Sequence, residues 1–362
     1  MSQVLDILKR DKELFFNDLN MDFEVSDTTS DINLIADFTE YNPLHNGHFH
    51  CMKTAKHMFP DSLFVAIVPG LFERSGRGIP YILPRENRAE IAISVGADVV
   101  VEGPPMGIMG SGQYSLCLCK MFKALNTDYI PRGYKPKEGF DEILKRINLG
   151  HHIAPKPYKI VDKTTNEIVL KDKLEEDNYV ITSFANSLSK IGFDYSNKFI
   201  FVKRIEGVSG TLIRESILND DFDNVLDMMP SKTIEVLKRE IKNDSIIYGI
   251  RDEDSILNTA NAFDFKELSD LNLFNDKLAK NILDNGPYDN LEELEKFILH
   301  GFSSHFRQRI LSILENSISK KDISRYIDKY PSNIRILGYK NNEVLEKFIK
   351  KVNNENISLF RG

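Results

Sequence analysis

Two histidines three residues apart, His45 and His48, carry the first chemical signal in this sequence. They lie in the stretch His45-Asn46-Gly47-His48, directly after an apolar run and an Asn-Pro turn, where a helix is expected to begin. The first turn of a helix exposes free backbone N–H groups, which favour phosphate, and two imidazoles add further donors. Attack on a nucleotide phosphate needs such donors, because charge builds on the phosphoryl oxygens. The alternative is a capped helix with exposed histidines.

A second candidate is the stretch Ser209-Gly210-Thr211-Leu212-Ile213-Arg214, which follows another apolar run. Hydroxyl groups, free N–H groups and the Arg214 guanidinium would together hold the β- and γ-phosphates of a nucleotide. In the simpler interpretation, Ser209 or Thr211 just caps a helix. We expect this helix start and the one at His45 to close on one nucleotide.

A glycine-rich loop with two arginines spans residues 69–78. We interpret it as a lid or substrate-gripping loop, with a second pair of arginines at the start of the following helix. The candidate substrate-loop residues are Gly70, Arg74, Arg77 and Arg88. The alternative is a mobile surface loop with solvated charges.

The elements that must position these residues alternate along the chain. Apolar runs of strand length occupy 32–38, 62–68, 99–101, 128–130 and 199–203, and helical patterns occupy 46–58, 85–95 and 114–125. Strands alternating with helices indicate an α/β fold, in which a parallel sheet is covered by helices on both faces. Ligands bind such sheets at the carboxyl ends of strands, where the His45 stretch is expected.

We expect this sheet domain to span residues 31–229, with an insertion near 135–180 that includes a charged hairpin around Thr164-Thr165-Asn166. An N-terminal helical arm is predicted over 1–30, with a polar linker at 26–31. Helical periodicity from about residue 230 predicts a separate helical C-terminal domain over 230–362.

Composition limits the possible classes of function. The chain has 362 residues, of which 41% are hydrophobic and 28% charged, and its net charge is −7. It contains no apolar run near 18 residues and no signal peptide, so we expect a cytoplasmic protein without a membrane partner. Three cysteines without a CxxC pair argue against a zinc site, and we expect no bound metal except Mg²⁺ carried on nucleotide phosphates. We interpret His151-His152 as a loop pair.

Two basic clusters are solvated surface or contacts to an RNA backbone. The first contains Lys145, Arg146, Lys156, Lys159 and Lys163, and the second contains Arg307, Arg309, Lys320, Lys321 and Arg325.

The stretch Glu40-Tyr41-Asn42-Pro43-Leu44-His45-Asn46-Gly47-His48 resembles the HxGH signature of the nucleotidylyltransferase superfamily, and its longer form resembles the tRNA(Met) cytidine acetate ligase family. The resemblance continues in the loop at 70–74, in 88–92, in 96–102, in Ser209 to Arg214 and in 334–339.

This resemblance implies a Rossmann-like (HUP-type) sheet and an enzyme that activates acetate with ATP, releases pyrophosphate, and acetylates N4 of the wobble cytidine of elongator methionine tRNA. His45 and His48 would stabilise the phosphates, and the helical C-terminal part would face the tRNA. The implied nucleotide contacts are Phe38, Thr39, Glu40, Asn42, Pro43, Gly47, Cys51, Gly133, Asn186 and Arg204, joined by Ser209, Thr211 and Arg214. The neighbours of Gly133 and Asn186 depart from the family pattern.

Acetate, or a similar carboxylate, and tRNA are therefore the expected partners. The alternative is an adenylyl- or cytidylyltransferase that acts on a small phosphorylated or carboxylate substrate without RNA. A non-catalytic RNA-binding module is disfavoured, because both histidines of the pair are present.

Overall fold

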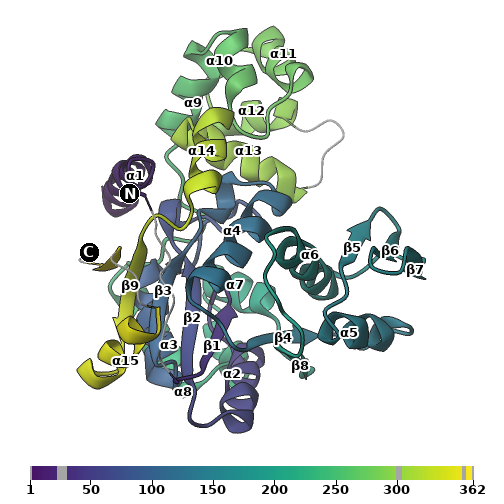
Figure 1. The fold of residues 1–362 in the computed structure, drawn as a ribbon. Coiled ribbons are helices and arrows are strands. Elements are labelled where there is room, and N and C mark those ends of the chain that lie inside the picture. The colour runs from purple at the N-terminus through teal and green to yellow at the C-terminus, as the bar shows by residue number, and fades with distance from the viewer. Residues whose placement is uncertain (1, 23–30, 299–303, 353–355, 361–362) are drawn as a thin grey trace.

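The computed structural model describes residues 2–22, 31–298, 304–352 and 356–360. Its main sheet runs in the order β1-β2-β3-β9-β10 (Figure 1). The strands are β1 Leu34–Phe38, β2 Leu63–Pro69, β3 Val99–Gly103, β9 Ile334–Tyr339 and β10 Ile357–Leu359. β1, β2 and β3 are parallel, whereas β9 runs antiparallel to β3 and parallel to β10.

Beyond β1 the sheet surface continues through a parallel bridge between Ile35 and Tyr129 to the pair β4 (Ile130–Tyr134) and β8 (Phe199–Lys203). β4 and β8 are also parallel. A strand was expected at 128–130. The observed strand begins only at Ile130 and continues to Tyr134.

Both faces of this sheet are buried, because alternate side chains of each strand enter different apolar clusters. Leu63, Val65 and Ile67 of β2 face one cluster, and Phe64 and Ala66 face the other. One cluster includes residues of α2 Asn46–Met58, α3 Arg85–Val95, α7 Gly210–Leu218 and α8 Ser231–Lys242. The other includes residues of α1 Ser2–Asp18, α4 Ser111–Ala124, α5 Phe140–Asn148 and α6 Glu176–Lys190. The predicted α/β fold with helices on both faces is confirmed.

Most of the chain beyond the sheet domain forms a lobe of short helices at the top of Figure 1. Its helices are α9 Glu253–Ala262, α10 Phe265–Asp270, α11 Asp276–Asn285, α12 Leu291–Ile298, α13 Ser304–Asn316 and α14 Lys320–Lys329. The chain then returns to the sheet as β9, α15 (Asn342–Val352) and β10. Helices therefore do not continue to residue 362 as expected, because the apolar alternation of Ile334 and Ile336 is that of a buried strand. The division into domains stays a prediction.

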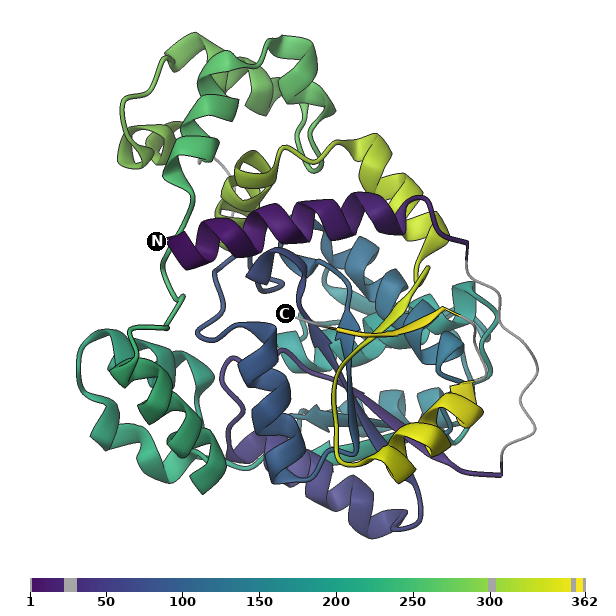
Figure 2. The same cartoon turned by 90° about the vertical axis from the view of Figure 1, so that its left-hand side faces the viewer.

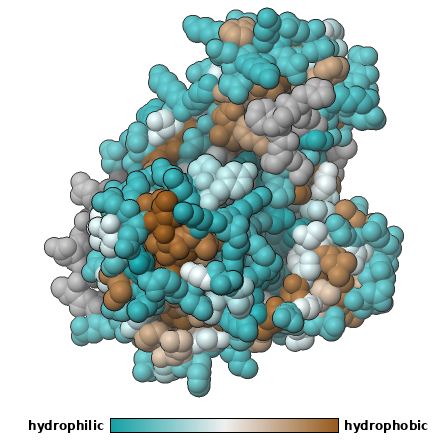
Figure 3. Space-filling view, turned by 90° about the vertical axis from the view of Figure 1, so that its right-hand side faces the viewer, coloured by the Kyte–Doolittle hydropathy of each residue, from teal (hydrophilic) through white to brown (hydrophobic). Residues whose placement is uncertain are grey.

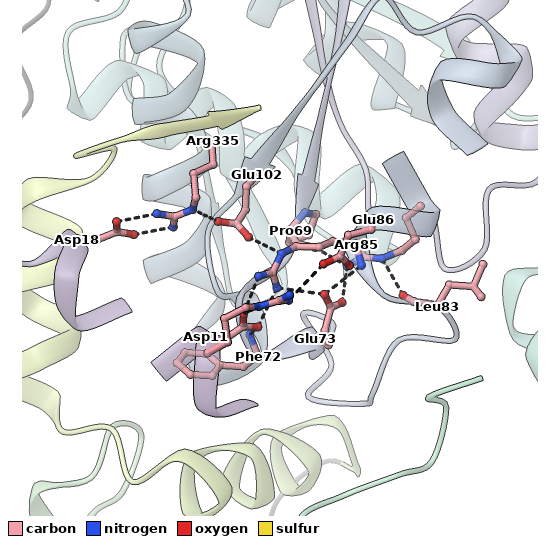
Figure 4. Close-up of polar contacts among 12 residues, drawn as sticks. Asp11, Asp18, Pro69, Phe72, Glu73, Leu83, Arg85, Glu86, Glu102 and Arg335 are labelled. Atoms are coloured by element: carbon pink, nitrogen blue, oxygen red, sulfur yellow. Dashed lines mark hydrogen bonds and ion pairs between the residues drawn. The ribbon is translucent and has the colours of Figure 1, made fainter. Parts of the chain in front are cut away.

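The N-terminal helix α1 lies across the sheet domain beneath the helical lobe (Figure 2). Its Asp11 pairs with Arg85, with Nη2 and Oδ1 2.6 Å apart, and its Asp18 pairs with Arg335 at 2.7 Å. Glu102 of β3 joins these two arginines in one buried network (Figure 4). Residues 2–18 are thus part of the packed core, while 26–30 of the expected linker lie outside the described residues.

The predicted insertion forms a second, antiparallel sheet at the right of Figure 1, in the order β5-β6-β7. Its strands are β5 Ile153–Lys156, β6 Lys159–Asp162 and β7 Glu167–Leu170. The hairpin expected around Thr164-Thr165-Asn166 is the β6–β7 turn. In the described part of the chain, no helix is both long and apolar enough to cross a bilayer.

Candidate active site

The two histidines cap the start of α2 through reciprocal hydrogen bonds. Nδ1 of His45 accepts the N–H of Gly47 at 3.2 Å, and Nδ1 of His48 accepts the N–H of His45 at 3.4 Å. A neutral imidazole whose Nδ1 is an acceptor carries its proton on Nε2. The sequence around the helix start therefore fixes both rings as Nε2–H donors for a ligand.

Burial keeps both imidazoles neutral at physiological pH. It lowers the pKa of His45 to about 4, with further lowering by the charges of Arg204 and Arg214. It also lowers the pKa of His48 well below the usual value, assisted by His45, Arg204 and Arg132. The pair can thus donate hydrogen bonds to phosphate oxygens without adding positive charge.

The start of α7 lies against the start of α2. A Cβ atom on Gly210 would lie 3.5 Å from Cδ2 and 3.6 Å from Nε2 of His45, so glycine allows close approach of the two helix ends. Ser209 caps α7, since its Oγ accepts the N–H of Leu212 at 3.2 Å. The structure thereby brings together the two helix starts that the sequence suggested as phosphate sites.

Arg214 joins the turn before α2 to α7. Its Nη1 donates to the carbonyl of Asn42 at 2.6 Å, and its Nη2 donates to Oγ1 of Thr211 at 3.1 Å. The Asn42 side chain accepts the N–H of Ile82 at 2.8 Å. The backbone and the side chain of Asn42 therefore both hold the turn before α2 in place through hydrogen bonds to other residues of the chain.

The remaining turn residues line or support the carboxyl end of β1. Phe38, Thr39 and Pro43 are buried, and Oε1 of Glu40 accepts the N–H of Gly76 at 2.6 Å. Cys51 is buried in α2, where burial raises the pKa of its thiol. A Cβ on Gly47 would lie 3.0 Å from Cε1 of His45, so this glycine makes room for the capping ring.

Three arginines surround the histidines, and one of them, Arg132, was missed by sequence reasoning. Its Nη1 donates to the carbonyl of Phe38 at 2.7 Å and lies 3.6 Å from Oδ1 of Asp37. Arg204 follows β8, next to Gly133 of β4, and forms an ion pair with Asp177 of α6. Arg132 follows the strand expected at 128–130 by two residues, and the carboxyl ends of strands are where ligands bind such sheets, which was the available signal.

The glycine-rich loop differs from the expectation, because two of its candidate arginines are buried. Arg74 forms a bidentate pair with Glu315 of α13, with Nε–Oε2 and Nη2–Oε1 distances of 2.8 and 2.6 Å, and both side chains are 0% exposed. Arg88 donates to Glu73 at 2.8 Å and to the carbonyls of Pro69 and Glu40. These guanidinium groups hold the loop in place, and their protein partners leave them unavailable to grip a substrate.

The rest of the loop is anchored to the helical lobe. The carbonyl of Gly78 accepts hydrogen bonds from Arg251 at 2.6 Å and Ser312 at 2.9 Å, and the carbonyl of Gly76 accepts from Arg309 at 2.6 Å. Arg77 remains partly exposed and pairs with Glu176 at 2.5 Å. The loop is therefore a docked segment, with Arg77 as its candidate substrate contact.

Gly70 belongs to the buried network behind the loop, since a Cβ there would lie 2.3 Å from Cδ of Arg85.

Asn186 is not brought to the histidines. It lies on α6 about 14 Å beyond Asp177, and its Oδ1 contacts Nε2 of His152 at 2.9 Å. Asn178, nearer the start of α6, bonds both backbone groups of Lys135. In this structure Asn186 contacts the insertion, and its role as a nucleotide contact stays a prediction.

The second basic cluster is partly engaged by the protein. Lys320 donates to the carbonyl of Ser269 and Arg325 to the side chain of Asn20, in addition to the contact of Arg309 with Gly76.

Comparison with protein families gives two matches that together span 33–338. Residues 33–134 match the family described as HIGH Nucleotidyl Transferase, and residues 135–338 match the cytidyltransferase-related C-terminal region. An uncharacterized protein of Methanocaldococcus jannaschii is 44% identical over 342 residues, covering 93% of this chain and 94% of that protein.

More distant relatives are named for an activity. The tRNA(Met) cytidine acetate ligase of Clostridium perfringens is 25% identical over 378 residues, covering 90% of this chain and 89% of that enzyme. The crystal structure of Thermotoga maritima TmcAL bound with alpha-thio ATP is similar in fold, with a TM-score of 0.72 and 21% identity over 88% of this chain and 84% of that chain.

Proposed function

Since the chain belongs to the family of HIGH nucleotidyl transferases, we propose that it is an ATP-dependent ligase that activates acetate, or a similar carboxylate, and acylates N4 of a cytidine in tRNA. The observation that carries this proposal is the meeting of two helix starts at His45, with neutral imidazole donors between them. The relatives named as tRNA(Met) cytidine acetate ligases support the choice of carboxylate and acceptor.

In the first step, a carboxylate oxygen attacks the α-phosphorus of ATP, and the bond to the pyrophosphate oxygen breaks. Charge grows on the phosphoryl oxygens, and the Nε2–H groups of His45 and His48 donate to them. The N–H groups at the starts of α2 and α7 that the caps do not use add donors that need no reorganisation. Arg204 and Arg214 supply positive charge for the departing pyrophosphate.

In the second step, the cytidine amine attacks the acyl carbon, and AMP leaves with the electron pair of the broken bond. The amine loses its proton to give the amide. We assign Mg²⁺ to the nucleotide phosphates, because Mg²⁺ keeps several waters and is usually held by substrate phosphates with few protein ligands.

The test is incubation of the protein with ATP, radiolabelled acetate and total tRNA, followed by measurement of label in RNA. Acetate-dependent pyrophosphate release with labelled RNA is the expected result. Pyrophosphate release without labelled RNA would retain activation and refute the acceptor. Absence of any acetate dependence would favour the second candidate, a nucleotidyltransferase that acts on a small substrate. This candidate is kept because the matched C-terminal region is described as cytidyltransferase-related.

A further inference from the structure

The β5-β6-β7 sheet carries an exposed face that the nucleotide site does not use. We propose that this outer face, formed by Lys156, Lys159, Val161, Lys163 and Ile168 with Tyr158 at the β5–β6 turn, binds the backbone and an unpaired base of the RNA acceptor. The inference rests on the proposed function, because it assigns a binding surface to that RNA.

Strand register places these residues on one side of the sheet. Lys156 is directly opposite Lys159, and Val161 is opposite Ile168. Alternate residues of a strand share a face, so Lys159 and Val161 point the same way, while Ile160 and Asp162 are buried on the other side. Lys163 is exposed in the turn that directly follows β6. Figure 3 faces the side of the molecule on which this sheet lies and shows apolar patches set among hydrophilic surface.

The carboxylates of Asp162 and Glu167 in this sheet are paired with other residues of the insertion. Oδ2 of the buried Asp162 contacts Nδ1 of His151 at 2.7 Å and Nη1 of Arg146 at 2.9 Å, and its Oδ1 accepts the N–H of Thr164 at 2.8 Å. Glu167 also pairs with Arg146, at 2.7 Å. The negative charge that could neutralise the outer face is thus directed inward or bound.

The lysines of the outer face, in contrast, have no ion-pair partner within the described residues. Lys156 and Lys159 are both exposed and oppose each other across the hairpin, an arrangement of like charges that destabilises a sheet. A phosphate between them would remove this repulsion. Residues 135–173 contain nine Lys or Arg residues against six Asp or Glu residues, whereas the whole chain has a net charge of −7.

An RNA fits this face better than an acidic protein does, because an aromatic ring accompanies the lysines. Tyr158 is 77% exposed in the turn between β5 and β6, where it adopts the left-handed conformation with a φ of 58°. Exposed aromatic rings beside basic groups are typical of surfaces that stack unpaired bases. Ile168, 46% exposed, extends the apolar platform.

The distance from the nucleotide site also indicates a large ligand. α6 connects the two places, with Asp177 paired to Arg204 and Asn186 bonded to His152 at the base of β5. These two positions are about 14 Å apart along the helix. A folded RNA is large enough to contact both ends of this helix.

The test compares the triple variant K156Q/K159Q/K163Q with the matched control K53Q/K242Q/K350Q, which removes the same charge from exposed lysines of α2, α8 and α15. The probe is an unmodified transcript of elongator methionine tRNA, and binding is measured by fluorescence anisotropy between about 50 and 200 mM salt. We expect the slope of log K against log salt to fall by about 2 to 3 in the triple variant, because each phosphate contact contributes about 0.7 to 0.9. The control is expected to keep the wild-type slope.

Tyr158 gives a separate test that a general loss of charge would not mimic. Y158A is expected to weaken binding about tenfold with an unchanged salt slope, and Y158F is expected to restore it, because stacking needs the ring and not the hydroxyl group. Equal slopes and affinities for the triple variant and its control would overturn the proposal, as would absence of binding by the wild-type protein at low salt.

Acetate-dependent exchange of pyrophosphate into ATP, measured without RNA on the same proteins, separates this inference from the proposed function. If the wild-type protein shows no exchange, and the triple variant binds RNA less well than the wild type does, the proposed activation fails and the RNA surface stands. If exchange proceeds and the triple variant binds RNA like its control, the surface assignment fails and the activation stands.

Discussion

The imidazole ring of His45 stacks on that of His48, with ring centroids 3.8 Å apart and planes inclined by 15°. Tyr41 also contacts His48 in an edge-on arrangement, at 5.4 Å between centroids. Stacking and capping together leave each ring little freedom, so the Nε2–H donors are oriented before a ligand arrives. Such preorganisation is what makes donors effective against a charge that develops during reaction.

Replacement of His48 by alanine should abolish adenylyl transfer while the protein still folds. We expect turnover to fall about 100- to 1,000-fold, as for loss of one oriented donor, and stability to fall by about 1 kcal/mol from the weakened cap. Acetate-dependent pyrophosphate exchange and a thermal melt measure the two effects. His57→Ala, at an exposed position near the end of the same helix, is the control. Full turnover of H48A would refute the assigned role.

The titration of His45 should occur near pH 4. Its pKa in the folded chain, about 4, lies below the usual value of 6.5, so the unfolded chain binds the extra proton first as pH falls. Stability from this group is therefore complete above pH 6.5 and is lost between pH 6.5 and 4. NMR of the imidazole Cε1–H resonance, assigned by comparison with His45→Gln, follows this titration. A midpoint between pH 6 and 7 would contradict the buried, neutral state.

Glu315→Gln should destabilise the protein strongly, because it leaves the buried charge of Arg74 incompletely compensated. Loss of one partner of a buried ion pair costs about 3 to 5 kcal/mol. The matched control is Glu343→Gln, which breaks the exposed pair with Lys347 and should cost less than about 1 kcal/mol. Urea unfolding measures both variants, and similar losses would show that Arg74 does not depend on Glu315.

Asp37→Asn should change how stability depends on pH. Burial raises the pKa of Asp37 to about 7, although the charge of Arg132 opposes the shift. The folded chain therefore holds this proton between pH 3.8 and about 7 after the unfolded chain has lost it, and stability falls with rising pH by up to about 1.4 kcal/mol per pH unit. The variant should lose that slope. Chemical unfolding at pH 5, 6, 7 and 8 measures it, and identical slopes for both proteins would count against the raised pKa.

Local sequence was sufficient for several elements near the site. α2, α3 and β8 begin and end where the apolar pattern, the helix-start residues and Pro84 place them. The alternation of strands and helices likewise predicted the covered sheet. These features depend on periodicity and on hydrogen bonds between residues close in the chain, which a sequence displays directly.

The assignment of individual arginines could not be made in this way. Arg74 and Arg77 are three residues apart in one loop, yet the first is buried against Glu315 and the second is partly exposed beside Glu176. Arg132 approaches the histidines through the pairing of β4 beside β1, and Asn186 is directed to His152 by the path of α6. Each outcome depends on a partner that is distant in sequence.

By itself, the sequence determined the helix start at His45-Asn46-Gly47-His48, because the residues that cap it lie within three positions of one another. The tertiary structure decided which charges remain for chemistry. Burial and pairing set the protonation of the histidines, withdrew Arg74 and Arg88 from the surface, and brought the start of α7 to His45. Electrostatic environment is a property of the assembled fold, since desolvation and Coulomb interactions depend on distance in space and not on distance along the chain.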